Sequence, residues 1–321
     1  MSEVNSLLSK KIRKKDRSNV KLIIKEVFRY RFFYFLVLPS MLWVFLFRYL
    51  PMYGISLAFV DYNFAEGLIG SKWVGIKYFI QLFNTEKFRQ ALWNTMIISM
   101  YKMVSGFIFP ILLALMLNEI TKDWYKRTLQ TAVYLPRFVS WVVYGGIILL
   151  LLSPETGLVN KVIEFIGGKP KYFLGEPAYF RSILMITDAM KEAGWGAVVY
   201  IAAITSIDIE MYESAKIDGV NMFQKIWYIT LPGIASTIIV MLIIRLGYIL
   251  NAGLDQVLNL YNPMVLQVGD ILDTYIYRQG VEQFNLSLAT AADLFKAIIG
   301  FILVIITNMI TKKINSDTGI V

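Results

Sequence analysis

The sequence contains no cysteine and no histidine among its 321 residues. Disulfide bonds and thiol chemistry are therefore excluded, and so are imidazole metal ligands and the commonest general base. The chain also lacks the G-x-x-x-x-G-K-[ST] loop that holds nucleotide phosphates, so any ATP hydrolysis would occur on another chain. We expect no enzyme, no catalytic residue, no metal site and no cofactor bound by this chain.

Charged residues are also scarce, at 17% of the chain, whereas soluble domains carry about 25%. Hydrophobic residues make up 57%. The net charge of +9 comes largely from the first 31 residues, where ten basic residues and three acidic ones directly precede an apolar run. Such a cluster orients a protein in a membrane and does not indicate nucleic-acid binding. We expect a multi-pass protein of the cell (plasma) membrane, with the lipid bilayer as a partner and no nucleic acid.

Six apolar segments are long enough to cross the hydrocarbon core, which takes about 20 residues of helix. The predicted fold is therefore an all-α polytopic membrane protein. Residues 1–30 are expected to form a basic arm without a signal-peptide cleavage site, residues 31–312 the transmembrane domain and residues 313–321 a short tail. The predicted spans are residues 31–50, 92–117, 129–152, 183–204, 233–250 and 291–310.

The distribution of Lys and Arg predicts how the spans are oriented. Segments expected inside carry 17 of these residues and the loops expected outside carry 9. Because basic residues favour the cytoplasmic side, both termini are predicted to be cytoplasmic. The outer loops are residues 53–90, 153–181 and 253–290. Glycine and proline punctuate the second of these loops, where we expect no long regular element.

A polar stretch, YESAKIDGVNMFQKIWYITLP, separates predicted spans 4 and 5 and runs from Tyr212 to Pro232. Asp218 and Gly219 supply a helix stop. Asn221 and Gln224 form a capping pair for a second short helix. The stretch is therefore predicted to be a cytoplasmic helix-turn-helix.

The spacing in this stretch resembles the EAA signature of ABC importer permeases (type I, carbohydrate uptake), with Ser214 as the one departure. The resemblance implies a coupling helix that sits in a cleft of an ATPase subunit, and we call residues 212–232 the coupling segment. Glu213 is expected to make a charge-assisted contact, Gly219 to allow the turn and Ala215 a close approach. The residues expected to couple to the ATPase are Glu213, Ser214, Ala215, Asp218, Gly219, Ile229, Leu231 and Pro232.

A second resemblance covers nearly the whole chain. Segments such as LPSMLWVFLFRYLPMYGISLAFVDYN and RTLQTAVYLPRFVSWVVYGGII are similar to LplB/YteP-type permeases of oligosaccharide importers. The resemblance implies import of oligosaccharides, including uronate-containing plant polysaccharide fragments such as pectin or rhamnogalacturonan pieces. It also implies four kinds of partner: a second homologous permease, two ATPase subunits that use ATP and Mg, an extracellular sugar-binding protein and the bilayer.

Charged and aromatic side chains within the spans are candidates for the sugar path. A charge inside a span is costly and usually faces protein or water. The same residues can instead form fixed pairs, such as Lys102 with a distant acid like Asp188 or Glu192, or Lys191 and Lys296 with neighbouring acids, and the aromatics can pack or form interfacial belts. The candidates are Lys102, Trp141, Tyr144, Trp195, Tyr200, Arg245 and Tyr248.

The alternative function is an ATPase-independent secondary transporter or channel. Broken helices in inverted repeats would favour it. The sequence shows no convincing internal repeat.

Overall fold

The computed structural model describes residues 29–247 and 249–314. These residues are mostly helical, with one short antiparallel pairing of β1 (Val60–Asp61) with β2 (Lys72–Trp73). The expected all-α fold is confirmed. The chain divides into two units, residues 1–56 and 57–321. Most of the expected arm (1–30) and tail (313–321) lies outside the described residues.

The first unit is built on α2 (Arg31–Val44), which continues through the π turn η1 (Phe45–Tyr49) into the 3₁₀ helix η2 (Leu50–Phe59), whose last three residues belong to the second unit. Together these elements form an apolar stretch of 29 residues that is long enough to cross a membrane. The helix therefore runs nine residues beyond the predicted end of span 1, because nothing at Pro51 or Gly54 stops it. Pro51 is the second residue of the 3₁₀ helix η2.

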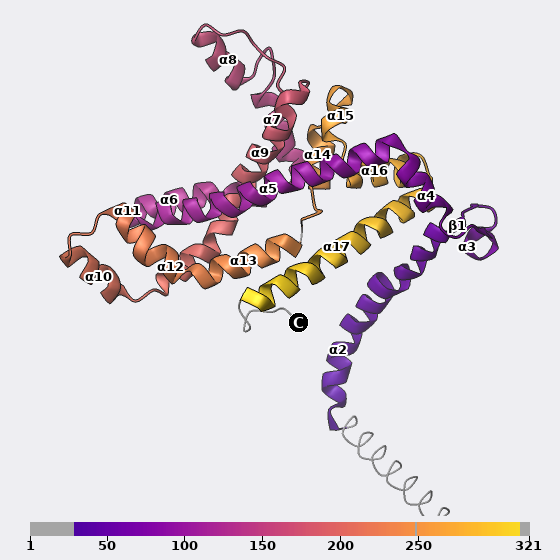
Figure 1. Ribbon diagram of the computed structural model, residues 1–321, viewed down its shortest axis with the longest axis horizontal. Coiled ribbons are helices and arrows are strands. Elements are labelled where there is room, and N and C mark those ends of the chain that lie inside the picture. Colours follow the sequence, from indigo (N-terminus) through magenta and orange to yellow (C-terminus); the bar gives the residue numbers. More distant parts are fainter. Residues whose placement is uncertain (1–28, 248, 315–321) are drawn as a thin grey trace, which may run out of the picture. The chain divides into compact units, whose positions relative to one another are not determined.

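In the second unit, two long helices, α5 (Glu86–Asn118) and α9 (Pro177–Thr205), pack along each other. Figure 1 shows α5 extending from the region of α11 to the region of α16. The last helix, α17 (Leu286–Ile314), packs against α13 (Ala235–Gly247) and against α4 (Lys77–Asn84). Three described helices are apolar enough to span a membrane singly, and three bent pairs raise the number of spans to as many as six.

Predicted span 3, residues 129–152, is a bent pair of helices and not one continuous helix. The chain forms α6 (Asp123–Tyr134) and the 3₁₀ turn η3 (Leu135–Phe138), then bends by 108° into α7 (Trp141–Leu151). The break occurs because Val139 and Ser140 are extended, and the hydroxyl of Ser140 accepts a hydrogen bond from the N–H of Val143. Serine in this N-cap role starts a new helix.

Bends also flank the coupling segment. Helix α9 turns by 75° into α10 (Ile209–Ile217). The chain then forms α11 (Met222–Lys225), η4 (Ile226–Thr230) and α12 (Leu231–Gly233), and bends by 65° into α13. The regular helix in predicted span 5 does not reach the expected residue 250, because Ile249 and Leu250 form a turn.

The three segments expected outside contain more helix than the sequence indicated. The eight-residue helix α8 lies in residues 153–181, and α9 begins at Pro177, within the predicted loop. These segments hold α3 (Gly67–Gly70), α4, α8 (Leu158–Phe165), α14 (Leu254–Leu260), η5 (Pro263–Val265), α15 (Leu266–Gly269), α16 (Leu272–Tyr277) and η6 (Arg278–Glu282).

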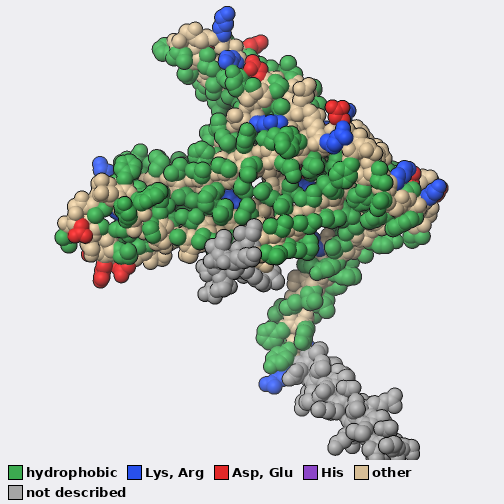
Figure 2. Space-filling model, in the orientation of Figure 1, with side chains coloured by type: hydrophobic (Ala, Val, Ile, Leu, Met, Phe, Trp, Pro, Cys, Tyr) green, Lys and Arg blue, Asp and Glu red, His purple; other side chains and the backbone are tan. Residues whose placement is uncertain are grey.

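The described part of the second unit has three buried apolar clusters. One joins α9 to α7 and α14, and one joins α4, α5, α16 and α17. The third joins α5 and α9 to residues 226–241, which include the end of the coupling segment. Figure 2 shows hydrophobic side chains over most of the visible face of residues 57–314, whereas charged ones gather toward the ends. An apolar outer surface with charged ends is typical of a membrane protein.

Candidate functional site

The turn of the coupling segment is built by local capping interactions. Asp218 ends α10, and Gly219 follows with a φ of +71°. The N–H of Val220 donates to the carbonyl of Ala215, and the N–H of Gly219 donates to the carbonyl of Lys216. This pattern is a Schellman motif, which favours glycine at the left-handed position. The structure therefore has the helix stop that Asp218 and Gly219 predict.

The second helix of the segment begins with a complete capping box. The side chain of Asn221 accepts from the N–H of Gln224, and the side chain of Gln224 accepts from the N–H of Asn221, at 2.9 and 3.0 Å. The predicted capping pair is confirmed. Such a box satisfies two backbone donors that the helix itself cannot satisfy.

Two contacts join the coupling segment to itself and to α5. The hydroxyls of Tyr212 and Thr230 lie 3.1 Å apart, which ties α10 to η4. The ammonium of Lys225 lies 2.6 Å from the carboxylate of Glu119, at the end of α5. The hydrogen bond therefore holds the two parts of the coupling segment together, and the ion pair anchors the segment to α5.

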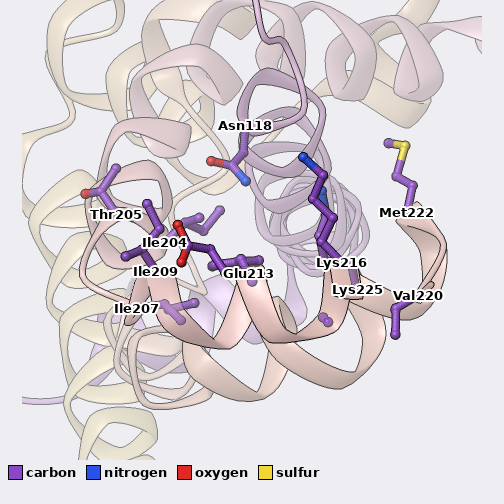
Figure 3. A pocket seen from close by; sticks show the side chains of 12 residues that line it. Asn118, Ile204, Thr205, Ile207, Ile209, Glu213, Lys216, Val220, Met222 and Lys225 are labelled. Atoms are coloured by element: carbon purple, nitrogen blue, oxygen red, sulfur yellow. The ribbon is translucent and has the colours of Figure 1, made fainter. Parts of the chain in front are cut away.

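A cavity of about 620 Å³ lies between α10, α11 and the ends of α5 and α9. Figure 3 shows Glu213 and Lys216 projecting from α10 toward the side on which Asn118 lies. Half of the residues that line the cavity are apolar, and the other half carry polar or charged groups. The lining residues are Asn118, Ile204, Thr205, Ile207, Ile209, Tyr212, Glu213, Ala215, Lys216, Val220, Met222 and Lys225.

The predicted coupling residues differ in exposure. Ala215 is buried within this chain, so the small side chain that meets the surroundings on α10 is Ser214. Ile229 and Leu231 are partly buried, and Leu231 packs at the edge of the third apolar cluster. The exposed members of the set are Glu213, Ser214, Asp218, Gly219 and Pro232.

A second polar site, which we call the polar cluster, lies among α5, η3, α7 and α9. Its charged residues are Lys102, Arg137, Asp188, Lys191 and Glu192. The ammonium of Lys102 donates to the carbonyl of Ala252 at 2.7 Å and lies 3.3 Å from the carboxylate of Asp188. Of the two interpretations left open for Lys102, a distant acid partner is the one that the structure shows. Because the pair is buried, removal of either residue would leave the other as an unpaired charge, which destabilises a folded protein.

Lys191 does not pair with a neighbouring acid as the sequence suggested. Its ammonium donates to the backbone carbonyls of Pro136, Arg137 and Val139, at the break between η3 and α7. It also lies over the rings of Trp141 and Tyr144, at 5.3 and 5.6 Å from their centroids. Carbonyl dipoles and ring faces thus replace a carboxylate as the partners of this cation.

The polar cluster is completed by contacts that the sequence did not indicate. Arg137 forms an ion pair with Glu192 at 2.8 Å. The side-chain amide of Gln256 donates to Thr187 and to the carbonyl of Leu184. The sequence gives little indication of these contacts, because a polar residue in an apolar span does not by itself show which residue it will contact.

The remaining pathway candidates lie apart from this cluster. Trp195 is half exposed and contacts Phe138, with ring centroids 6.0 Å apart. Tyr200 is buried in the third apolar cluster. Arg245 lies against Gly106, where an added Cβ would approach its guanidinium to 2.0 Å. Tyr248 lies outside the described residues. The structure thus brings together Lys102, Trp141 and Tyr144 from the predicted set. Lys296, for which the sequence suggested a neighbouring acid as the partner, pairs with Asp273, which is 23 residues away in the sequence.

Comparison with known proteins identifies the family. The model of the family described as binding-protein-dependent transport system inner membrane component matches residues 106–316. The polygalacturonan/rhamnogalacturonan transport system permease protein YteP of Bacillus subtilis (strain 168) is 39% identical, covering 98% of this chain and 96% of that protein. Protein LplB of the same organism is 40% identical over 90% of this chain and 91% of its own length.

A solved structure agrees with these relatives. The chain resembles a component of the crystal structure of a bacterial alginate ABC transporter in complex with an alginate pentasaccharide-bound periplasmic protein. The TM-score is 0.83 and the identity 40%, over 92% of this chain and 99% of that one. These similarities, together with the helical fold and its apolar spans, show that the chain belongs to the family of inner-membrane components of binding-protein-dependent transport systems, the permeases of ABC importers.

Proposed function

We propose that this chain is the permease subunit of an ATP-driven importer that receives uronate-containing oligosaccharides from an extracellular binding protein. The observation that carries the proposal is the agreement among relatives at 39–40% identity over at least 90% of the chain. Their descriptions name polygalacturonan/rhamnogalacturonan in one case and the acidic polysaccharide alginate in another. Uronate-containing fragments such as pectin or rhamnogalacturonan pieces are therefore the proposed substrate class.

The polar cluster supports an acidic substrate. Within it, three cations face two carboxylates, which leaves one positive charge in excess, and two aromatic rings lie beside it. A sugar carboxylate would gain from the excess charge, and a pyranose face can pack on an aromatic ring. The charged residues are Lys102, Arg137, Lys191, Asp188 and Glu192.

We further propose that the coupling segment docks on an ATPase. The chain has no phosphate-binding loop of its own, so two ATPase subunits would use ATP and Mg, and a second homologous permease would complete the pathway. Closure of the ATPase pair would move the segment as a rigid body and shift the spans between inward- and outward-open states. The exposed residues of the set, Glu213, Ser214, Asp218, Gly219 and Pro232, would contact the ATPase, and the more buried Ala215, Ile229 and Leu231 would support the shape of the segment.

The proposed function also implies how the chain is oriented in the membrane. Residues 31–312 form the permease domain with six spans, both termini are cytoplasmic, and the coupling segment is inside. Three bent helix pairs on their own would also suit an ATPase-independent transporter. Membership of the binding-protein-dependent family favours the importer.

The test is uptake into proteoliposomes that hold the complete transporter, with the binding protein outside and ATP inside. An acidic trisaccharide of galacturonate and a neutral trisaccharide of equal length are compared. We expect ATP-dependent uptake of the acidic sugar and weak uptake of the neutral one. Equal uptake of both sugars would overturn the substrate class, and uptake by this chain alone without ATP would overturn the importer.

A further inference from the structure

Glu119 has a position that helix stability does not explain. It is the C-cap of the 33-residue helix α5, and its side chain is 16% exposed. The C-terminal end of a helix carries partial negative charge, so a carboxylate there is unfavourable. A nearby cation has to offset this cost, and Lys225 supplies it at 2.6 Å.

Lys225 belongs to a part of the coupling segment that is held by a capping box and by a hydrogen bond between side chains. It ends α11, whose start is fixed by the Asn221–Gln224 capping box. The next element, η4, is tied to α10 through Thr230, which is fully buried, and Tyr212. Any displacement of α10 by a docked partner therefore carries Lys225 with it.

Glu119 would pass such a displacement to the 33-residue helix α5. Lys102 lies 17 residues earlier on α5, about 26 Å away at 1.5 Å per residue. There it donates to Ala252 and pairs with Asp188 on α9. Helix α5 thus has one charged contact at the coupling segment and another in the polar cluster.

We propose that the Glu119–Lys225 ion pair is a positioning contact that transmits movement of the coupling segment to α5 and, through Lys102, to the polar cluster. The inference rests on the proposed function as an ATP-driven importer. Neither residue touches the sugar or the nucleotide. The pair sets how much sugar crosses for each ATP hydrolysed.

The experiment is a charge swap in the complete transporter reconstituted in proteoliposomes. Glu119→Gln, Lys225→Gln, Glu119→Lys and Lys225→Glu are compared with the double variant Glu119→Lys/Lys225→Glu. The readout is sugar taken up per ATP hydrolysed, a ratio that does not depend on the amount of folded protein. We expect each single variant to lower the ratio about tenfold while hydrolysis continues, a typical size for coupling between sites.

The double variant is expected to recover at least half of the wild-type ratio, because the attraction is restored with its sign reversed. Lys122→Glu is the matched control, since it changes an exposed lysine of the neighbouring loop and should leave the ratio unchanged. Single variants with a wild-type ratio would overturn the inference, and so would a double variant as uncoupled as the single ones. If the wild-type transporter itself shows no ATP-dependent uptake, the proposed function fails instead.

Discussion

Lys102 on α5 and Asp188 on α9 form an ion pair whose side chains are only 9% and 18% exposed, with the ammonium 3.3 Å from the carboxylate. The same ammonium donates to the carbonyl of Ala252. Three chain segments that are distant in sequence therefore meet at one cation. Removal of that cation leaves a buried carboxylate without its partner.

Lys102→Met is expected to destabilise the protein by about 3–5 kcal/mol, the usual cost of breaking a buried pair from one side. The double variant Lys102→Met/Asp188→Leu should recover most of this loss, because no unpaired charge remains. Thermal unfolding in detergent measures both. Equal destabilisation in the single and double variants would show that the pair is not the stabilising feature.

Gly219→Ala is expected to impair ATP-coupled uptake more than insertion in the membrane. The left-handed conformation costs a residue with a Cβ about 1–2 kcal/mol, and that strain falls on the turn between α10 and α11. Gly167→Ala is the matched control, since Gly167 also has a positive φ, and an added Cβ meets nothing within 4 Å at either position. Uptake assays on both variants should separate them, and equal loss of uptake would contradict a special role for the coupling turn.

The hydroxyl of Tyr78 donates to Asp61 at 2.6 Å, outside the membrane-spanning segments. Burial and the carboxylate raise the pKa of Tyr78 to about 12, and the hydrogen bonds from Tyr78 and Lys77 lower the pKa of Asp61. The raised pKa of Tyr78 contributes stability that is complete below pH 10 and is lost as the pH rises through about 12. The lowered pKa of Asp61 contributes stability that is present above about pH 4 and is lost in more acidic solution.

Tyr78→Phe should therefore lower the unfolding temperature by a constant amount between about pH 5 and 9. The difference from the wild-type protein should shrink above pH 10, because Tyr78 ionises near pH 10 in the unfolded chain and only near pH 12 in the folded protein. Tyr172→Phe, at an exposed tyrosine, serves as the control. A difference that stays constant up to pH 12 would contradict the assignment.

Much of the coupling segment could be predicted from the sequence because its structure is local. The Asp218–Gly219 stop and the Asn221–Gln224 box each involve residues at most five positions apart, so the local sequence determines the backbone directly. The apolar runs likewise indicated the number of spans. The bend at Val139 and Ser140 was not predicted, because a serine N-cap within a long apolar run cannot be told from a serine in the middle of a helix.

The contacts of the polar cluster could not be predicted in the same way. Lys102 and Ala252 are 150 residues apart, and Glu119 and Lys225 are 106 apart. Their pairing depends on how α5, α9 and the coupling segment pack against one another. The residue type at one position does not determine that packing. Lys191 is the clearest case, because its partners are backbone carbonyls at a helix break.

Single cysteines can establish which side of the membrane each segment faces, without background, because the chain has no native cysteine. Ala65→Cys and Lys169→Cys should react with an impermeant thiol reagent in intact cells, and Lys122→Cys should react only after permeabilisation. All three positions are exposed. Labelling of Lys122→Cys from outside would reverse the proposed topology.

The most direct test of the central claim is cross-linking from the coupling segment. A photoactivatable maleimide attached to Ser214→Cys, which is exposed on α10, is activated in membranes that contain the assembled transporter. Ala65→Cys carries the same probe as a control. We predict that Ser214→Cys captures the ATPase subunit and that Ala65→Cys does not. Capture of no ATPase at Ser214, in a transporter that still takes up sugar, would contradict the account.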